Sequence, residues 1–334
     1  MSKKRVLSGI QPTGELHIGN YFGAVSNWVK LQDEYECIYA VVDLHAMTMP
    51  YDPAVLKKNT ENLVIDLLAA GLDPDKCILA IQSLVPEHTE LYWLFSCITP
   101  YGDLTRQTQF KDKSSQIDTT SGNSFISAGL FTYPTLQAAD ILVYLAEFVP
   151  VGKDQEQHLE LSREIARRFN MQFGELFPEP KVLSTETPKI YSPADPEKKM
   201  SKSLGEKHYV GLFEDPDSIR KKIRSAVTDS GNLPAGTPMS PGVESLFSML
   251  KACGKLDDAA SLKADYDAGE LRYVTLKDAV VTALVELTGT LRERRDGIDR
   301  AEAMAKAREM SEKARDIAAD TVSKARDLMG LPHR

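Results

Sequence analysis

The sequence predicts an α/β protein in which a parallel-sheet domain is followed by an all-helical domain. Over roughly the first 205 residues, short apolar runs rich in β-formers alternate with helical patterns, which is typical of βαβ units on a parallel sheet. After about Pro216 the strand patterns disappear, and only the stretch DSGNLPAGTPMSPG interrupts the helical periodicity. The chain has 334 residues, enough for two domains of ordinary size.

The elements of the first domain are predicted in a regular order. The run VLSGI predicts the first strand, and the helix after it should bury apolar residues spaced four, three and four apart: Ile18, Phe22, Val25 and Val29. Further strands are predicted in CIYAVV, CILAIQS and FVPVG, and further helices between Pro53 and Ala70, in AADILVYLA and in QEQHLELSREIARRF. The polar, poorly periodic segment near residues 103–130 predicts an insertion across the sheet.

The second domain is predicted to end in one long amphipathic helix, over GIDRAEAMAKAREMSEKARDIAADTVSKARDL. It contains two basic clusters, SIRKKIRSAVTDS and LRERRDGIDR, in a chain of formal net charge −8. Local basic clusters suit contacts with an RNA backbone, although solvated helix faces account for most charge runs. The acidic total argues against a protein that coats nucleic acid generally, and we predict no DNA binding.

Composition excludes several other classes of protein. The 42% hydrophobic and 26% charged residues are typical of a globular domain. No segment approaches the roughly 18 apolar residues of a membrane span, and the amino terminus lacks a signal-peptide stretch, so we predict a cytoplasmic protein without a membrane partner. The four cysteines have no paired spacing, which predicts reduced thiols and no metal ligands: Cys37, Cys77, Cys97 and Cys253.

A glycine-containing turn, QPTGELHIGN at residues 11–20, separates the first strand from its helix. Ligands bind beyond the carboxyl ends of strands in open α/β sheets, so this turn should lie at the binding edge. His17 and Asn20 are three residues apart at the helix start, where both could donate to a phosphate. Gly14 and Gly19 would allow close backbone approach or a positive φ. The alternative is an ordinary glycine turn with a capping asparagine.

A second polar loop, EKKMSKS at residues 197–203, follows the last strand pattern. Its lysines carry compact ammonium groups that suit a polyphosphate, and its serines add donors. The two common phosphate-binding fingerprints, G-x-x-x-x-G-K-[ST] and G-x-G-x-x-G, are absent. A nucleotide would therefore be bound in another way, and a solvated surface loop is the alternative.

The pair of HIGN after the first strand and KMSKS after the last resembles the two signatures of class I aminoacyl-tRNA synthetases. Within that class the chain resembles the bacterial tryptophanyl-tRNA synthetases over residues 8–203, in SGIQPTGELHIGNYFGA, DLHAMT, TQFKDKS, YPTLQAADILVY, VPVGKDQEQHLELSREIARRFN and KKMSKS. The resemblance implies a Rossmann-like catalytic domain at residues 1–205 and a helical anticodon-binding domain at residues 206–334. It also implies that L-tryptophan is activated by ATP, accompanied by Mg²⁺, and then transferred to tRNA(Trp).

The same resemblance assigns residues to the nucleotide site. Lys113, Lys199 and Lys202 would be catalytic by binding the departing pyrophosphate, which agrees with a reaction that needs electrostatic stabilisation more than covalent chemistry. The ATP site would be formed by Gln11, Pro12, Thr13, His17, Gly19, Asn20, Gly152, Lys153, Asp154, Ile190, Lys199, Met200, Ser201, Lys202 and Ser203.

The resemblance also assigns the tryptophan pocket. Asp140 would accept the indole N–H, which suits a carboxylate because the indole nitrogen can only donate. Tyr133 would line the same pocket, and an ordinary core aromatic is the alternative. His45 follows a predicted strand and could also line this pocket, or it could be a structural histidine. Gln137 is a departure, since many members have methionine there, and it makes QAAD resemble tyrosyl-tRNA synthetases. Tyrosine stays open as an alternative substrate, and Asp140 could instead brace a helix.

Two further functions remain as alternatives. A nucleotidylyltransferase of related fold would have no need of KMSKS together with a tRNA-sized helical domain. A non-catalytic sensor of amino acid or RNA is disfavoured by the intact set of phosphate-binding lysines. The family is homodimeric, so we expect a homodimer, and a tRNA bound across two subunits would reconcile acidic net charge with local basic patches.

Overall fold

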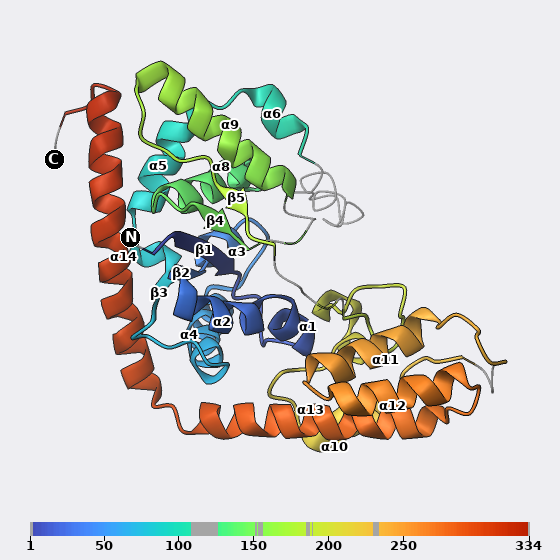
Figure 1. The fold of residues 1–334 in the computed structure, drawn as a ribbon. Helices are drawn as coiled ribbons and strands as arrows, with labels where there is room; N and C mark the ends of the chain where they lie inside the picture. The colour runs from blue at the N-terminus through green and yellow to red at the C-terminus, as the bar shows by residue number, and fades with distance from the viewer. Residues whose placement is uncertain are drawn as a thin grey trace.

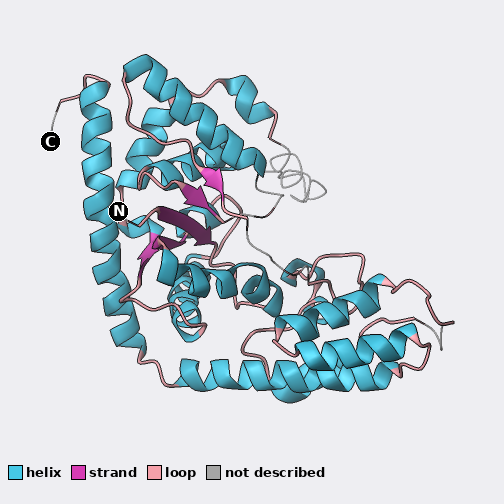
Figure 2. Ribbon diagram, viewed as in Figure 1, coloured by secondary structure: helices cyan, strands magenta, loops and turns pink. Residues whose placement is uncertain are grey.

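The computed structural model describes residues 3–107, 126–150, 152, 156–184, 188, 190–229 and 234–332. A five-stranded parallel sheet lies between layers of helices, and a separate group of helices lies beside it (Figures 1 and 2). The predicted class, a parallel α/β fold followed by helices, is confirmed. Within the described residues no helix is long and apolar enough to cross a membrane.

The sheet has the strand order β3-β2-β1-β4-β5. Its strands are β1 (Arg5–Ile10), β2 (Glu36–Val41), β3 (Cys77–Ile81), β4 (Phe148–Val149) and β5 (Lys181–Val182). The chain moves outward from β1 to β3 and returns to the other side of β1 with β4, so the strand order reverses beside β1. Ligands bind outside the carboxyl ends of strands at such a reversal. Residues 11–20 leave β1 at this position.

Successive strand residues alternate between two hydrophobic clusters on opposite faces of the sheet. Val6 belongs to the first cluster and Leu7 to the second, as the two-residue period of a strand requires. The first cluster continues without interruption into the helical group, where it includes Leu246 and Leu284. The helical group therefore shares a core with the part of the chain that carries the turn at residues 11–20.

The helix after β1 begins as a short turn, α1 (Ile18–Asn20), continues as a π-helical turn over Tyr21–Val25 and ends as α2 (Ser26–Glu34). Of the predicted buried face, the first three residues are buried, whereas Val29 is half-buried. Trp28 is buried in its place, because its ring stacks on Tyr39 of β2 at 4.7 Å between centroids.

The remaining helices of the α/β part surround the sheet: α3 (Asp43–Ala46), α4 (Pro53–Ala69), α5 (Glu87–Ser96), α6 (Tyr101–Thr105), α8 (Ala128–Leu142) and α9 (Glu156–Phe173). Capping interactions stabilise the first turns of two of these helices. Asp52 caps α4 by accepting from the backbone N–H groups of Ala54 and Val55, and Pro53 occupies the first turn, where a missing N–H does no harm. Ser127 caps α8 in the same way.

The helical group consists of α10 (Pro216–Arg224), α11 (Pro241–Ala252), α12 (Leu256–Asp267) and α13 (Tyr273–Asp296), and it is followed by α14 (Arg300–Leu328). The long carboxyl-terminal helix expected from the sequence is thus present. It leaves the helical group and runs along the β3 edge of the sheet (Figure 1). Met310 Sδ and Ser311 Oγ accept from the backbone N–H groups of Leu79 and Ile81, so α14 satisfies donors of an edge strand.

Candidate active site

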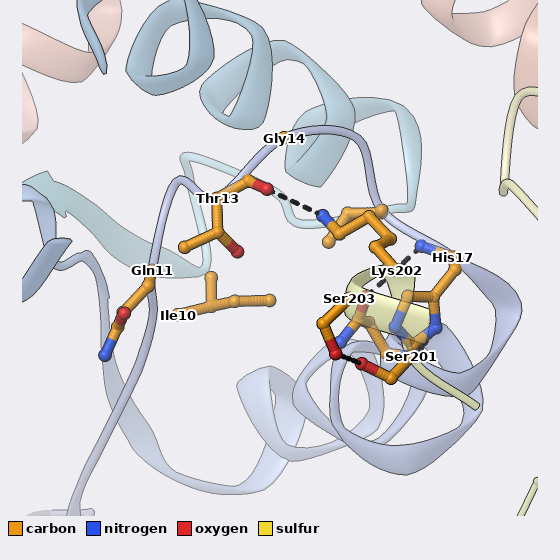
Figure 3. Close-up of a pocket in the computed structure, with 10 residues that line it drawn as sticks. Ile10, Gln11, Thr13, Gly14, His17, Ser201, Lys202 and Ser203 are labelled. Carbon is orange, nitrogen blue, oxygen red and sulfur yellow. Dashed lines mark hydrogen bonds between the residues drawn. The ribbon is translucent and has the colours of Figure 1, made fainter. Parts of the chain in front are cut away.

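A cavity of about 620 Å³ lies between the turn after β1 and the KMSKS loop (Figure 3). Its lining comprises Ile10, Gln11, Thr13, Gly14, Leu16, His17, Asn20, Ser201, Lys202 and Ser203. None of these lining residues is acidic, and most of them carry hydrogen-bond donors. The fold therefore brings together the two polar segments that the sequence analysis singled out, in a cavity suited to an anion.

The KMSKS loop is held on the turn by Lys202. Its Nζ donates to the backbone carbonyl oxygens of Thr13, at 3.0 Å, and Glu15, at 2.8 Å. Gly14 between them has a φ of +102°, and a Cβ there would lie 3.4 Å from Lys202 Nζ. Burial lowers the pKa of the Lys202 ammonium, and the negative charges of Glu15 and Asp66 oppose this effect.

His17 and Asn20 cap the helix start reciprocally. The His17 N–H donates to Asn20 Oδ1 and the Asn20 N–H donates to His17 Nδ1, each at 3.2 Å. Because Nδ1 accepts, the ring proton is on Nε2. Burial, then Lys202 and then Lys199 lower the pKa of His17 to about 4. At neutral pH the ring is uncharged and can donate to a phosphate through Nε2–H alone.

Gly19 is required by the His17 ring. A Cβ at this position would lie 2.9 Å from His17 Nδ1 and 3.0 Å from Cε1. The backbone at Gly19 has no positive φ. The sequence predicts either close approach of another group or a positive φ at this glycine. Close approach applies, and the approaching group is the His17 imidazole.

The other described residues predicted for the ATP site are not among those that line this cavity. Ile190 and Met200 are buried in the core beneath the loop, and the Met200 N–H donates to the Ile190 carbonyl at 3.2 Å. Pro12 is buried, Lys199 is exposed, and Gly152 is exposed after β4. The predicted residues Lys113, Lys153 and Asp154 lie outside the described residues.

Asp140 of α8 is buried within a set of donors. His45 donates through Nε2 to Asp140 Oδ2 at 2.7 Å. Gln82 Nε2 and His88 Nδ1 donate to Oδ1 at 2.8 and 2.7 Å. An ionised carboxylate can only accept, so both imidazoles are donors here. Burial alone would raise the pKa of Asp140, but His45 and His88 outweigh burial and lower it to about 2.

Among the described residues three hydrogen bonds reach the Asp140 carboxylate, which leaves about one of its four lone-pair sites unused. The expectation that Asp140 braces the structure and the expectation that it accepts from a substrate are therefore compatible. The free site suits a ligand with a single N–H or O–H donor.

The other residues predicted for the amino-acid pocket lie close to this carboxylate. The Tyr133 ring stands edge-on to the His45 ring, with 6.2 Å between centroids, and its hydroxyl bonds to His158 Nε2 at 3.0 Å. Gln137 is half-buried on α8, three residues before Asp140. Tyr133, His45 and Asp140 are thus brought together as expected.

Sequence analysis missed three residues of this network: Gln82, His88 and Tyr144. The Tyr144 hydroxyl bonds to His88 Nε2 at 2.8 Å, which fixes the tautomer of His88. Gln82 follows β3 directly, and polar residues that follow a buried strand are a usable signal of a site at the carboxyl edge of a sheet.

Comparison with known proteins identifies the family of the chain. Residues 2–289 match the family model of tRNA synthetases class I (W and Y). The chain is 43% identical over 332 residues, 98% of each chain, to a tryptophan–tRNA ligase of Caldanaerobacter subterraneus. Among solved structures it resembles the tryptophanyl-tRNA synthetase of Mycoplasma pneumoniae, with a TM-score of 0.88, 36% identity and coverage of 99% of this chain and 98% of that one.

A further solved structure shows a related protein with small molecules bound. The tryptophanyl-tRNA synthetase of Campylobacter jejuni, complexed with ADP and tryptophan, is 33% identical, with a TM-score of 0.83 and coverage of 98% of this chain and 100% of that one. The nucleotidylyltransferase and sensor alternatives are thereby set aside. By its motifs, its fold and these full-length matches, the chain belongs to the class I tRNA synthetases of the tryptophan and tyrosine group.

Proposed function

We propose that this synthetase is a tryptophan–tRNA ligase. The carboxylate of L-tryptophan attacks the α-phosphorus of ATP, the bond to pyrophosphate breaks, and tryptophanyl-adenylate forms. A hydroxyl of the terminal ribose of tRNA(Trp) then attacks the tryptophan carbonyl and releases AMP. The observation that carries the proposal is the buried, ionised Asp140 carboxylate, which among the described residues keeps one acceptor site for an amino-acid side chain with a donor. The full-length relative and solved structures reported above support it.

ATP is proposed to bind in the cavity between the turn and the KMSKS loop. Gln11, Thr13 and Asn20 would contact the nucleotide, and the Nε2–H of His17 would donate to a phosphate oxygen. Lys202, with Lys199 and Lys113, would stabilise the charge that develops on the departing pyrophosphate. The lack of acidic residues among those that line the cavity supports this assignment.

Mg²⁺ is proposed to arrive with ATP. Among the described residues no group of three or more His, Cys, Asp or Glu side chains could hold a metal ion. Phosphate oxygens and water are the ligands that Mg²⁺ commonly keeps in nucleotide sites. The ion would neutralise charge on the phosphates, while Lys202 and the backbone of the turn orient them.

Tyrosine is the alternative amino acid, and pyrophosphate exchange into ATP distinguishes the two. We expect exchange with tryptophan and a rate with phenylalanine lower by roughly 10⁴-fold, because a buried acceptor without its donor is costly. Tyrosine carries a hydroxyl donor, so the rate measured with tyrosine distinguishes the two amino acids directly. Exchange with tyrosine, or with none of the twenty amino acids, would overturn the proposal. Asp140→Asn should raise the KM for tryptophan by tenfold or more, on the order of one lost charged hydrogen bond, while leaving the KM for ATP within about twofold.

The helical group is proposed to read the anticodon of the tRNA, because RNA readers usually engage unpaired bases. Some of the basic residues expected to contact RNA form ion pairs within the protein. Arg220 and Arg224 of α10 pair with Asp217 and Asp278, and Arg295 of α13 pairs with Asp66. Lys221 of α10 is exposed and is the better candidate for a phosphate contact.

A homodimer is also proposed. Trp93 of α5 and Tyr101 of α6 are 66% and 74% exposed, and large exposed aromatic side chains are typical of protein interfaces. Sedimentation should show a dimer at micromolar concentration that Trp93→Asp weakens, and a monomer of the parent would remove the proposal. A cytoplasmic location remains our proposal on the sequence features given above.

A further inference from the structure

Helix α14 contacts two of the three segments of the chain that donate hydrogen bonds to Asp140. The Ile81 N–H donates to Ser311 Oγ at 3.0 Å, and Ile81 directly precedes Gln82. Arg315 Nε donates to Glu87 Oε1 at 3.1 Å, and Glu87 directly precedes His88. Gln82 and His88 are the two donors to Asp140 Oδ1. The carboxyl-terminal helix thus contacts the residue that directly precedes each of these two donors.

The Ser311 hydroxyl is fixed in its orientation. It donates its proton to the Ala307 carbonyl at 2.7 Å, within the same helix, which leaves its lone pairs for the Ile81 N–H. Ser311 and Arg315 are four residues apart and therefore lie on one face of α14. The same face of the helix supports the end of β3 and the start of α5.

The Glu87 carboxylate depends on Arg315. Its side chain is 5% exposed, and Oε2 has no hydrogen-bond partner among the described residues. Removing a cation from such a carboxylate leaves a buried charge without compensation, which favours movement of the segment that carries it. Burial, then Asp140 and then Glu87 raise the pKa of Tyr144, whose hydroxyl bonds to His88. Glu87 is bonded along the chain to His88, so a movement of Glu87 would displace this donor to Asp140.

We propose that Ser311 and Arg315 of α14 are positioning residues for amino-acid recognition. They hold Gln82 and His88 in place and thereby orient the free acceptor site of Asp140 toward the tryptophan indole. The inference rests on the proposed role of Asp140. It extends the specificity site to a helix that follows the helical group, far along the chain from the catalytic motifs.

The test compares two arginines that join the same two helices. Arg326 of α14 pairs with Glu90 of α5, but Glu90 adjoins neither donor to Asp140, so Arg326→Met is the matched control for Arg315→Met. In pyrophosphate exchange, Arg315→Met should raise the KM for tryptophan on the order of tenfold, as small displacements of a recognition group do, with the KM for ATP within about twofold. Ser311→Ala should act in the same direction. Arg326→Met should leave both constants unchanged.

A double variant separates positioning from loss of packing. Glu87→Gln combined with Arg315→Met removes the buried charge together with its partner and should return the KM for tryptophan to within about threefold of the parent. Equal effects of Arg315→Met and Arg326→Met, or a double variant no better than Arg315→Met, would overturn the proposal.

Asp140→Asn measured in parallel distinguishes this inference from the proposed function. If Asp140→Asn raises the KM for tryptophan and Arg315→Met does not, the positioning role of α14 fails while that of Asp140 stands. If neither variant changes this KM, the role of Asp140 itself is wrong.

Discussion

The Lys202 ammonium lies 2.8 Å from the backbone carbonyl oxygen of Glu15, in the turn that follows the first strand. A second N–H of the same ammonium bonds to the Thr13 carbonyl. The two loops are therefore joined by protein groups alone, and one of the three lysine N–H donors remains for a phosphate oxygen. Within the described part of the chain this ammonium forms no ion pair with a carboxylate, so its positive charge remains available at the cavity.

Replacing Lys202 should slow the chemical step more than it weakens amino-acid binding. We expect Lys202→Ala to lower kcat of tryptophan-dependent pyrophosphate exchange by roughly 10²-fold, as loss of one transition-state donor does, with the KM for tryptophan within twofold. Lys198→Ala is the control, because Lys198 pairs with Asp195 at 3.1 Å and does not line the cavity. A Lys202→Ala enzyme as fast as the Lys198→Ala enzyme would contradict the assigned role.

Two glycines of one helix provide a matched test of the His17 position. Gly19→Ala would drive a methyl group into the His17 ring, whereas a Cβ at Gly23 meets nothing within 4 Å. We expect Gly19→Ala to raise the KM for ATP about tenfold through displacement of the ring, and to cost about 1 kcal/mol of unfolding free energy through loss of the cap. Gly23→Ala should be neutral or slightly stabilising. Equal behaviour of the two variants in both assays would show that the ring is not held by close packing.

His17 should titrate far below an ordinary histidine. Burial, Lys202 and Lys199 lower its pKa from 6.5 to about 4, so its contribution to stability is full above pH 6.5 and is lost as pH falls toward 4. The Cε1 proton resonance, followed by NMR, should show a midpoint near pH 4. Lys202→Ala should raise that midpoint in part, because burial remains. A midpoint near 6.5 in the parent would mean that the imidazole is solvated and can be charged near neutral pH.

Asp66 of α4 should make stability depend on pH in the opposite direction. Burial raises its pKa to about 6, outweighing Arg295, whose Nε lies 2.7 Å from Oδ1. The folded state therefore favours the protonated carboxyl, and this contribution is full below about pH 4 and is lost as pH rises through 6. The shift of about 2 pKa units corresponds to roughly 3 kcal/mol.

The difference in unfolding free energy between the parent and Asp66→Asn measures that contribution. Chemical denaturation at pH 4 and at pH 7 should show the parent losing up to about 3 kcal/mol relative to the variant over this interval. A difference that stays constant between the two pH values would place an ionised Asp66 in the folded state throughout.

Four of the five strands and the two polar segments proposed to bind phosphate could be predicted because they depend on local information, whereas β5 was not predicted. Strands β1, β2 and β3 are largely apolar runs bounded by polar residues, and this pattern can be recognised without knowing which strands pair with one another. The buried face of the first helix was predicted less well. Val29 is half-buried because Trp28 beside it can stack on Tyr39, a residue of a different element that spacing along the helix does not reveal.

The hydrogen-bond network around Asp140 shows most clearly which features could not be predicted from the sequence. Residues from three other segments donate to this carboxylate, and only His45 among them was predicted. Hydrogen-bond partners of a buried charge are chosen by proximity in space. A single sequence carries no record of that proximity when the partners are far apart along the chain.

The sequence by itself determined the α/β class, the positions of four of the five strands, the family and the residues proposed to bind phosphate, because periodicity and short motifs are local properties. Only the tertiary structure decided that Lys202 binds the carbonyls of the first turn, that His17 is neutral and that α14 supports the donors to Asp140. Each of these depends on burial and on contacts between distant segments. Desolvation and hydrogen-bond geometry are set only once the chain has packed.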